Sequence, residues 1–413
     1  MNARSGAAIV FSIMLADAVT TILFNLDFSF WRVSILYKSF VEIALLVYFF
    51  PREKYRYWYL LVVFMTISYS VGISLLSLDV NGVKFFNGFA SANKYLFVFV
   101  LGMVFMELRS SKRFVNEMEM LITYFFLVNS VLVILGFVFK IQLFASYPTG
   151  IIRGEVLDVA RFGYKGLIGA INEATGVYFF GLAYLFRAYF RYDKKDALGV
   201  LLLTIIAAIL SGSKGCWAIV LVFSVYFLYK YRRRKFLLKY VPITAMVIFV
   251  FGGAMWMYVW TRYLYYFQFF LRPGGEDWIT FLMSGRTLEI QHSLEFMAKN
   301  WNFGNYIFGG SDLHLLMSET GLDGYFMFGI PFLALLFSYI RLFLEKDSTS
   351  ENKFILIFFL LLAATGGHIF ASAVVPPFFL IYVFTARPTK GPNSKGHQRR
   401  ATRDPDPGRL GYA

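Results

Sequence analysis

The sequence predicts an all-α, polytopic membrane protein with about 12 transmembrane helices. Of its 413 residues, 58% are hydrophobic and only 16% are charged, a balance far too apolar for an ordinary soluble chain. The apolar residues fall in continuous runs, and a helix needs about 20 such residues to cross the hydrocarbon core. The runs lack the alternation typical of barrel strands, so only helices fit them.

The expected spans follow one another along residues 1–386, which we expect to form one transmembrane domain. The first run contains Asp17 and lacks a small-residue cleavage site, so it is expected to be a span and not a cleaved signal. The last run is short and begins at Pro376 and Pro377. Spans are expected at 7–26, 33–50, 58–77, 90–107, 119–139, 168–187, 197–210, 215–230, 241–260, 322–341, 354–372 and 375–386.

The basic residues indicate the orientation of these spans. If the N-terminus is cytoplasmic and the spans alternate, cytoplasmic segments hold 27 of the 40 Lys and Arg residues. The positive-inside rule therefore favours cytoplasmic N- and C-termini. The tail at 387–413 is rich in Pro, Gly and charge and is expected to be disordered. The same bias accounts for the formal charge of +15, so no nucleic-acid partner is expected.

Two segments on the opposite, periplasmic side are long, at 140–167 and 261–321. The second is the larger loop and shows helical periodicity between Ser284 and Ala298. An amphipathic helix lying at the outer interface fits that pattern. Its apolar positions are Leu288, Ile290, Leu294, Phe296 and Met297.

Several basic residues fall near the outer side. Lys38 has three possible roles: an i, i+4 pair with Glu42, a cross-helix pair with Asp17, or substrate contact. Lys94 and Lys214 have no nearby carboxylate in the sequence, so substrate contact is favoured for them. Together with three further outer residues they predict a basic cluster suited to a diphosphate. Those residues are Arg161, Lys165 and Arg286.

Four stretches on this side resemble the O-antigen polymerase and O-antigen ligase superfamily of bacterial inner-membrane proteins. The stretches are Arg161 to Asn172-Glu173, Ser211-Gly212-Ser213-Lys214-Gly215, Ser284-Gly285-Arg286, and His314 followed by Gly321-Leu322-Asp323-Gly324. The resemblance covers roughly residues 90–386. It implies a fold like that of membrane C-type glycosyltransferases, with a large periplasmic loop near the C-terminal third.

The chain departs from the superfamily pattern at two places. The turn residue that is usually Arg is Lys214 here, which keeps the charge but loses the forked donor set. The interval between His314 and the first glycine of the Gly-x-x-Gly pattern is shorter than in ligases, which favours a polymerase. His292 and His368 are alternative histidines for a direct role.

The resemblance implies that the protein polymerises repeat units carried on undecaprenyl diphosphate. Arg286 is expected to stabilise the leaving diphosphate, and His314 or Glu319 to assist the attacking hydroxyl. No metal or cofactor is expected. The lipid bilayer is an expected partner, and a chain-length regulator is a candidate further partner. The residues expected to bind the substrate are Arg161, Lys165, Asn172, Lys214 and Lys94.

Other functions remain open from the sequence. A ligase that joins the glycan to the lipid A core is the close alternative. A transporter or flippase of lipid-linked sugars also needs buried charge. The concentration of polar residues in one loop and the lack of internal repeats argue against it. A structural membrane subunit would leave the basic cluster unexplained.

Overall fold

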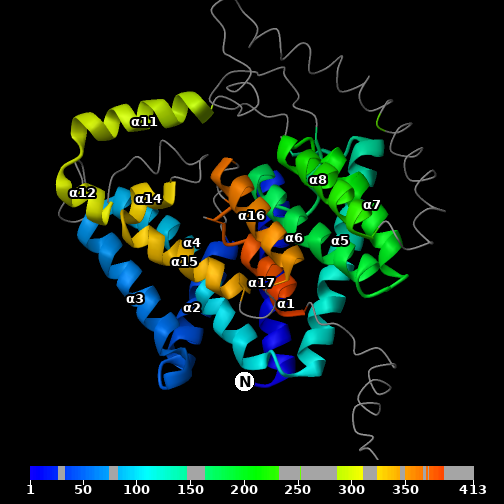
Figure 1. The fold of residues 1–413 in the computed structure, drawn as a ribbon, viewed down its shortest axis with the longest axis horizontal. Helices are drawn as coiled ribbons and strands as arrows, with labels where there is room; N and C mark the ends of the chain where they lie inside the picture. Colours follow the sequence, from blue (N-terminus) through cyan, green and yellow to red (C-terminus); the bar gives the residue numbers. More distant parts are fainter. Residues whose placement is uncertain are drawn as a thin grey trace, which may run out of the picture.

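The computed structural model describes residues 1–26, 33–73, 82–146, 163–231, 252, 286–309, 323–344, 349–365, 369–370 and 372–385. Within these ranges only the backbone is described at 82–91, 171–172, 286–289, 293, 323 and 365. The described helices form a bundle, and one further helix lies across its upper side in the view of Figure 1. The sequence-based expectation for 241–260 and for the tail at 387–413 lies outside the described residues.

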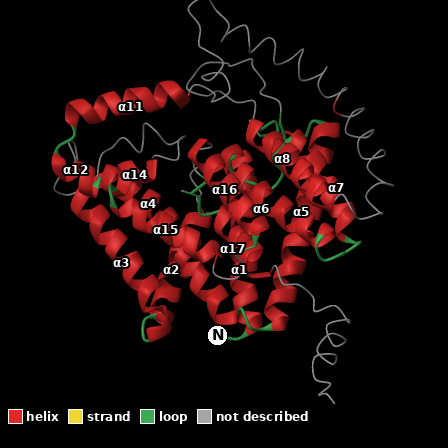
Figure 2. Cartoon of the chain, in the orientation of Figure 1, coloured by secondary structure: helices red, strands yellow, loops and turns green. Residues whose placement is uncertain are grey.

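Every named element in the described part of the chain is a helix (Figure 2), which confirms the all-α prediction. Short 3-10 turns cover Glu53–Tyr55 and Gln142–Phe144. The α-helices are α1 (Ala3–Asn25), α2 (Val33–Phe49), α3 (Arg56–Val71), α4 (Gly82–Leu108), α5 (Lys112–Phe139), α6 (Ile171–Phe190), α7 (Ala197–Leu210), α8 (Lys214–Tyr231), α11 (Arg286–Asn300), α12 (Phe303–Phe308), α14 (Asp323–Phe328), α15 (Pro331–Leu344), α16 (Ser350–Thr365) and α17 (Val375–Thr385).

One predicted span is interrupted. The segment expected at 322–341 forms two helices, α14 and α15, with a break at Gly329. Gly329 has a φ of +63°, and a Cβ added there would lie 2.3 Å from the Ile307 carbonyl oxygen. The next amide, Ile330 N–H, donates to that same carbonyl over 3.0 Å. The Ile330 N–H therefore bonds to the end of α12 and not to a carbonyl of its own helix, as it would in a continuous helix. Glycine is required at position 329 because a side chain there would clash with the Ile307 carbonyl.

Two of the described helices, α1 and α5, are long and apolar enough to cross a membrane. Three shorter helices, α7, α15 and α17, are also mainly apolar. Length and composition alone support a membrane location for these segments. Each of the other expected spans, apart from 241–260, overlaps in sequence with a described helix.

The centre of the bundle is formed by α4, α6 and α17. Every described side chain of α17 is buried, and so is nearly all of α6 after its first turn. Close packing here depends in part on Gly181, because the Phe126 ring of α5 lies against α6 at this position. A Cβ at Gly181 would stand 1.9 Å from the ring carbon Cζ of Phe126.

The surrounding helices expose large apolar side chains on their outer faces. On α2 the exposed residues recur every three or four positions, which places them on one face of the helix. Leu36, Phe40, Ile43 and Val47 are 73%, 79%, 63% and 70% exposed. The buried face of the same helix carries polar Ser34, Lys38 and Glu42 together with apolar Leu45 and Phe49. The exposed apolar face differs from that of a soluble protein, whose exposed helix faces are polar.

Charged side chains gather at the end of the bundle that holds the N-terminus, here called the proximal end. The fully buried Arg187 guanidinium lies 2.9 Å from the Glu351 carboxylate, which Lys230 also contacts at 2.9 Å. This cluster joins α6, α8 and α16. Two further ion pairs at this end are Arg52–Glu107 and Lys194–Glu119, each 2.6 Å long. The basic segments that the positive-inside rule assigns to the cytoplasm therefore lie together at the proximal end.

Candidate functional site

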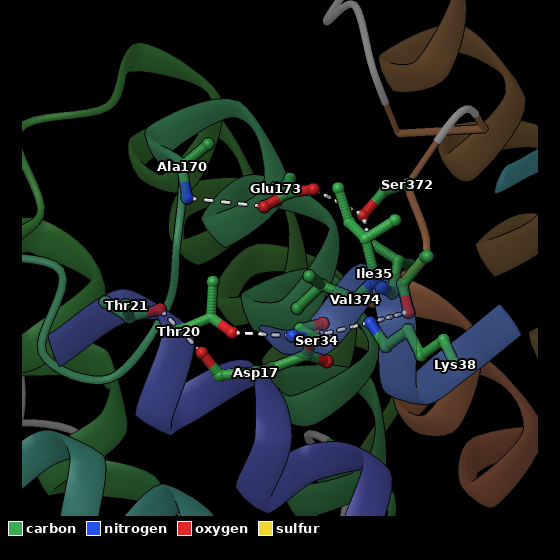
Figure 3. A network of polar contacts seen from close by, with 12 residues as sticks. Asp17, Thr20, Thr21, Ser34, Ile35, Lys38, Ala170, Glu173, Ser372 and Val374 are labelled. Carbon is green, nitrogen blue, oxygen red and sulfur yellow. Dashed lines mark hydrogen bonds and ion pairs between the residues drawn. The ribbon is translucent and has the colours of Figure 1, made fainter. Parts of the chain in front are cut away.

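The opposite end of the bundle, here called the distal end, carries a polar network built from sequence-distant segments (Figure 3). The C-terminal half of α1 lies beside the start of α2, where the Ser34 N–H donates to the Thr20 hydroxyl over 2.9 Å. The Ser372 hydroxyl, just before α17, donates to the Glu173 carboxylate at the start of α6 over 3.1 Å. The ends of α1, α2, α6 and α17 therefore share one set of polar contacts.

Lys38 is the cation of this network. Its ammonium lies 2.5 Å from the Asp17 carboxylate, and the two side chains are 6% and 9% exposed. The Ser34 hydroxyl donates to the same carboxylate, while Lys38 also donates to the Ala373 carbonyl over 2.7 Å. The cross-helix pair with Asp17, one of the possibilities from the sequence, is thus confirmed. Pairing and hydrogen bonding offset the high cost of burying these charges.

Glu42, the other carboxylate considered for Lys38, has a different partner. Its side chain is 4% exposed and accepts a hydrogen bond of 2.5 Å from the Asn93 side-chain amide of α4. Among the described residues, no Lys, Arg or His forms an ion pair with Glu42. The i, i+4 pair between Lys38 and Glu42 is therefore absent from the structure.

Glu173 fixes the start of α6. It is the third residue of the helix, and one carboxylate oxygen accepts from the Ala170 N–H over 3.3 Å. This is half of a capping box, because the alanine at the cap has no side-chain oxygen to return the bond. The other oxygen accepts from Ser372, so Glu173 also holds the segment before α17. Asn172, the adjacent predicted substrate-binding residue, lies in the first turn, where the structure describes its backbone only.

Lys165 lies in the loop that leads into α6. Its side chain is turned inward: the residue is 3% exposed, and its ammonium donates to the Gly169 carbonyl. Burial lowers the pKa of Lys165 to about 8, an effect that the nearby Glu173 carboxylate partly opposes. In this conformation Lys165 closes its own loop and does not present its amine at the surface.

The backbone of this loop packs closely on α5 and on the turn after α7. Gly163 has a φ of +151°, and a Cβ there would lie 2.2 Å from the Ser211 carbonyl oxygen. Gly166 has a φ of +64° and lies against the side chain of Asn129, which accepts a 2.8 Å hydrogen bond from the Leu167 N–H. Both glycines are needed because a side chain would be strained and would clash.

The turn between α7 and α8 lies beside the start of α6. Gly212 has a φ of +73°, so the chain reverses within three residues before α8 begins at Lys214. The Ser213 and Thr175 hydroxyls are 3.0 Å apart and tie the turn to α6. Lys214 itself is exposed. Lys165, the first turn of α6 with Asn172, and Lys214 therefore lie at the same end of the bundle.

The predicted amphipathic helix is present as α11, on the distal side of the bundle (Figure 1). It is attached through Met297, which packs on Phe326 of α14, with Ile290 and Phe296 beside them. Leu294, which was expected on the apolar face, is instead 54% exposed. His292 is exposed as well. Arg286 is the first residue of α11, and only its backbone is described.

The other predicted site residues have mixed outcomes. Lys94 is half-buried on α4, next to the Asn93 that contacts Glu42. Arg161, His314, Glu319 and the alternative His368 lie outside the described residues. Glu173 lies in the motif that ends at Asn172-Glu173 and is not among the predicted site residues. The residue three positions before it is Ala170, so the sequence lacks the Ser, Thr, Asp or Asn that would complete a capping-box pattern and indicate its role.

Comparisons with protein families, with curated proteins and with solved structures found no match to this chain. Within the described ranges, no three His, Cys, Asp or Glu side chains are grouped so that they could hold a metal ion.

Proposed function

We propose that this chain is a polytopic inner-membrane glycosyltransferase of bacteria, with about 12 transmembrane helices and a fold like that of the membrane C-type enzymes. Its substrate would be oligosaccharide repeat units linked to undecaprenyl diphosphate, which it would polymerise at the periplasmic face during surface polysaccharide synthesis. The observation that carries the proposal is the distal end, where the loop that holds Lys165, the start of α6 and the turn before Lys214 pack together.

The exposed apolar faces support a membrane location. Large apolar residues that are more than half exposed occur on several outer helices, and such continuous apolar surface is unfavourable in water. Lipid removes that cost. Examples are Phe40 on α2, Phe64 on α3, Tyr124 on α5 and Leu221 on α8, which are 79%, 51%, 58% and 66% exposed.

The charge distribution supports the orientation. The proximal end holds the N-terminus and basic residues such as Arg52, Arg113, Lys194 and Lys230, which the positive-inside rule assigns to the cytoplasm. The distal end would then be periplasmic. Repeat units that have already crossed the membrane would meet α11, the Lys214 turn and the start of α6 on that side.

The reaction requires stabilisation of a leaving diphosphate. The bond between the anomeric carbon of the growing chain and its diphosphate oxygen breaks, and a hydroxyl of the second repeat unit forms the new glycosidic bond. The hydroxyl proton goes to a base, for which His314 and Glu319 are the proposed groups. Arg286, Lys214 and Arg161 would stabilise the released undecaprenyl diphosphate.

Lys165 and Glu173 would then stabilise the loop before α6 and the start of α6, next to the proposed diphosphate site. Lys165 would have to leave the Gly169 carbonyl to reach a phosphate, so its described contact favours a role in shaping the loop. Glu173 fixes the α6 N-terminus by accepting from the Ala170 N–H, and the dipole of a helix favours an anion near its N-terminus. Neutral Asn172 and cationic Lys214 are the groups at that end with the polarity to contact a diphosphate.

Deletion of the gene tests the proposal through the surface glycan of the strain. Loss of a polymerase should leave a single repeat unit attached to the lipid A core, because export and ligation continue. A missing ligase would leave bare core with long polymer retained on undecaprenyl diphosphate. A missing flippase would give no repeat unit on the surface and would trap lipid-linked units on the cytoplasmic leaflet. Either of the last two results would overturn the proposed polymerase.

A further inference from the structure

Two buried carboxylates lie on the first two helices, Asp17 on α1 and Glu42 on α2, and their surroundings differ. Asp17 has a buried cation, Lys38, at 2.5 Å. Glu42 lies on the same face of α2, one turn beyond Lys38, and is 4% exposed. Its hydrogen-bond partner is the uncharged amide of Asn93, at 2.5 Å. One carboxylate is therefore neutralised by an ammonium group, while the other is buried beside a neutral donor.

Among the described residues, the helices packed against Glu42 supply no cation that forms an ion pair with it. From α1 the nearby charged group is Asp17, which is already paired. From α4, Lys94 follows Asn93 directly, and successive helical residues point about 100° apart around the axis. Glu107 of α4 lies at the proximal end, where Arg52 holds it at 2.6 Å. A charged carboxylate buried in this position would have no counter-ion, which is strongly unfavourable.

We propose that Glu42 is a proton-binding site inside the helical bundle, and that its carboxyl group carries a proton in the folded protein. The site goes beyond the proposed glycosyl transfer and does not depend on it. A neutral carboxyl beside an amide can both donate and accept a hydrogen bond, so the Glu42–Asn93 contact is satisfied without a net charge.

Occupancy of this site would be coupled to the distal network through Lys38. If Glu42 lost its proton, a second carboxylate would stand four residues from Lys38 on the same helix face, at the spacing of a favourable ion pair. It would compete with Asp17 and with the Ala373 carbonyl for the ammonium. Ala373 adjoins Ser372, which contacts Glu173. The proton on Glu42 therefore keeps Lys38 on the segment that leads into α17.

Infrared spectroscopy of the purified full-length protein tests the proton directly. A neutral carboxyl group has a C=O stretch above the amide I band, which an ionised carboxylate lacks. The spectrum at neutral pH should lose one such band in Glu42→Gln and none in the control Glu117→Gln, because the half-exposed Glu117 carboxylate pairs with Arg113 at 2.8 Å. Absence of a Glu42-dependent band, in protein that elutes as a single folded species, would overturn the proposal.

A second measurement compares the thermal stability of wild type and Glu42→Gln at several pH values. Glutamine mimics the neutral carboxyl, so the two proteins should unfold at the same temperature below the pKa of an unfolded glutamate, about 4.3, where the carboxyl is neutral in both states. As the pH rises, wild type should lose stability relative to Glu42→Gln, because the unfolded chain releases this proton more readily than the folded protein. Parallel pH dependence of the two proteins would show that Glu42 is already ionised and would also overturn the proposal.

Discussion

The ammonium of Lys38 on α2 lies 2.5 Å from the carboxylate of Asp17 on α1, inside the bundle. Breaking a buried pair by removing one partner typically lowers the free energy of unfolding by about 3–5 kcal/mol. Lys38→Met should therefore lower the thermal stability of the protein in detergent by that order. The double variant Lys38→Met/Asp17→Asn should recover part of the loss, because no uncompensated charge remains.

Lys54 provides the matched control for this prediction. Its side chain is 58% exposed, and its ammonium lies 3.5 Å from the Glu107 carboxylate. An exposed pair of this kind contributes about 0–1 kcal/mol. Thermal unfolding of Lys54→Met should be close to that of wild type. Equal losses in Lys38→Met and Lys54→Met would contradict the buried arrangement.

Gly181 should be intolerant of a side chain. Phe126 occupies the place of its missing Cβ, and overpacking in a core costs about 1–3 kcal/mol. Gly181→Ala should lower the unfolding temperature, and Phe126→Leu in the same chain should restore part of it. A Cβ added to Gly199 on α7 would meet no atom within 4 Å, so Gly199→Ala should be neutral or stabilising. Unchanged stability in Gly181→Ala would place Phe126 elsewhere.

Lys165 should give the protein a pH-dependent stability above pH 8. Its pKa is about 8 in the fold and about 10.4 in an unfolded chain. Between these values the unfolded chain binds more protons, so stability rises with pH through this window. Wild type should therefore gain up to about 1.4 kcal/mol per pH unit relative to Lys165→Met. Thermal unfolding of both proteins from pH 7 to 10 measures this, and parallel curves would contradict the buried amine.

The two ends of the bundle should lie on opposite sides of the membrane. Cys216 is the single cysteine of the chain and is fully buried, so wild type should resist a membrane-impermeant maleimide. In intact cells with a permeabilised outer membrane, Lys214→Cys should be labelled, whereas Lys54→Cys should be labelled only after lysis. Labelling with the opposite order would invert the orientation and place the distal network in the cytoplasm.

The sequence predicted the helices of the bundle well, because long apolar runs between polar breaks leave few alternatives. It also predicted a turn between the spans at 197–210 and 215–230; the structure has this turn at 211–213, and Lys214 is the first residue of α8. The partners of Lys38 and Glu42 could not be chosen from spacing, since α1 and α4 supply them from elsewhere in the chain. The break at Gly329 was missed although Gly329 and Pro331, both typical of helix breaks, lie within the expected span. The carbonyl that accepts from the Ile330 N–H there is that of Ile307, which belongs to a different helix.

Elongation by the purified protein is the most direct test of the proposed polymerase. Full-length protein in liposomes would be incubated with lipid-linked repeat units extracted from the deletion strain, with a chelator present. Wild type should produce a ladder of longer glycans on undecaprenyl diphosphate. Arg286→Ala should produce none and Arg286→Lys little, because a single point charge replaces a bidentate donor, while Arg113→Ala at the proximal end should behave as wild type. Intact substrate left unextended by folded wild-type protein would contradict the proposed function.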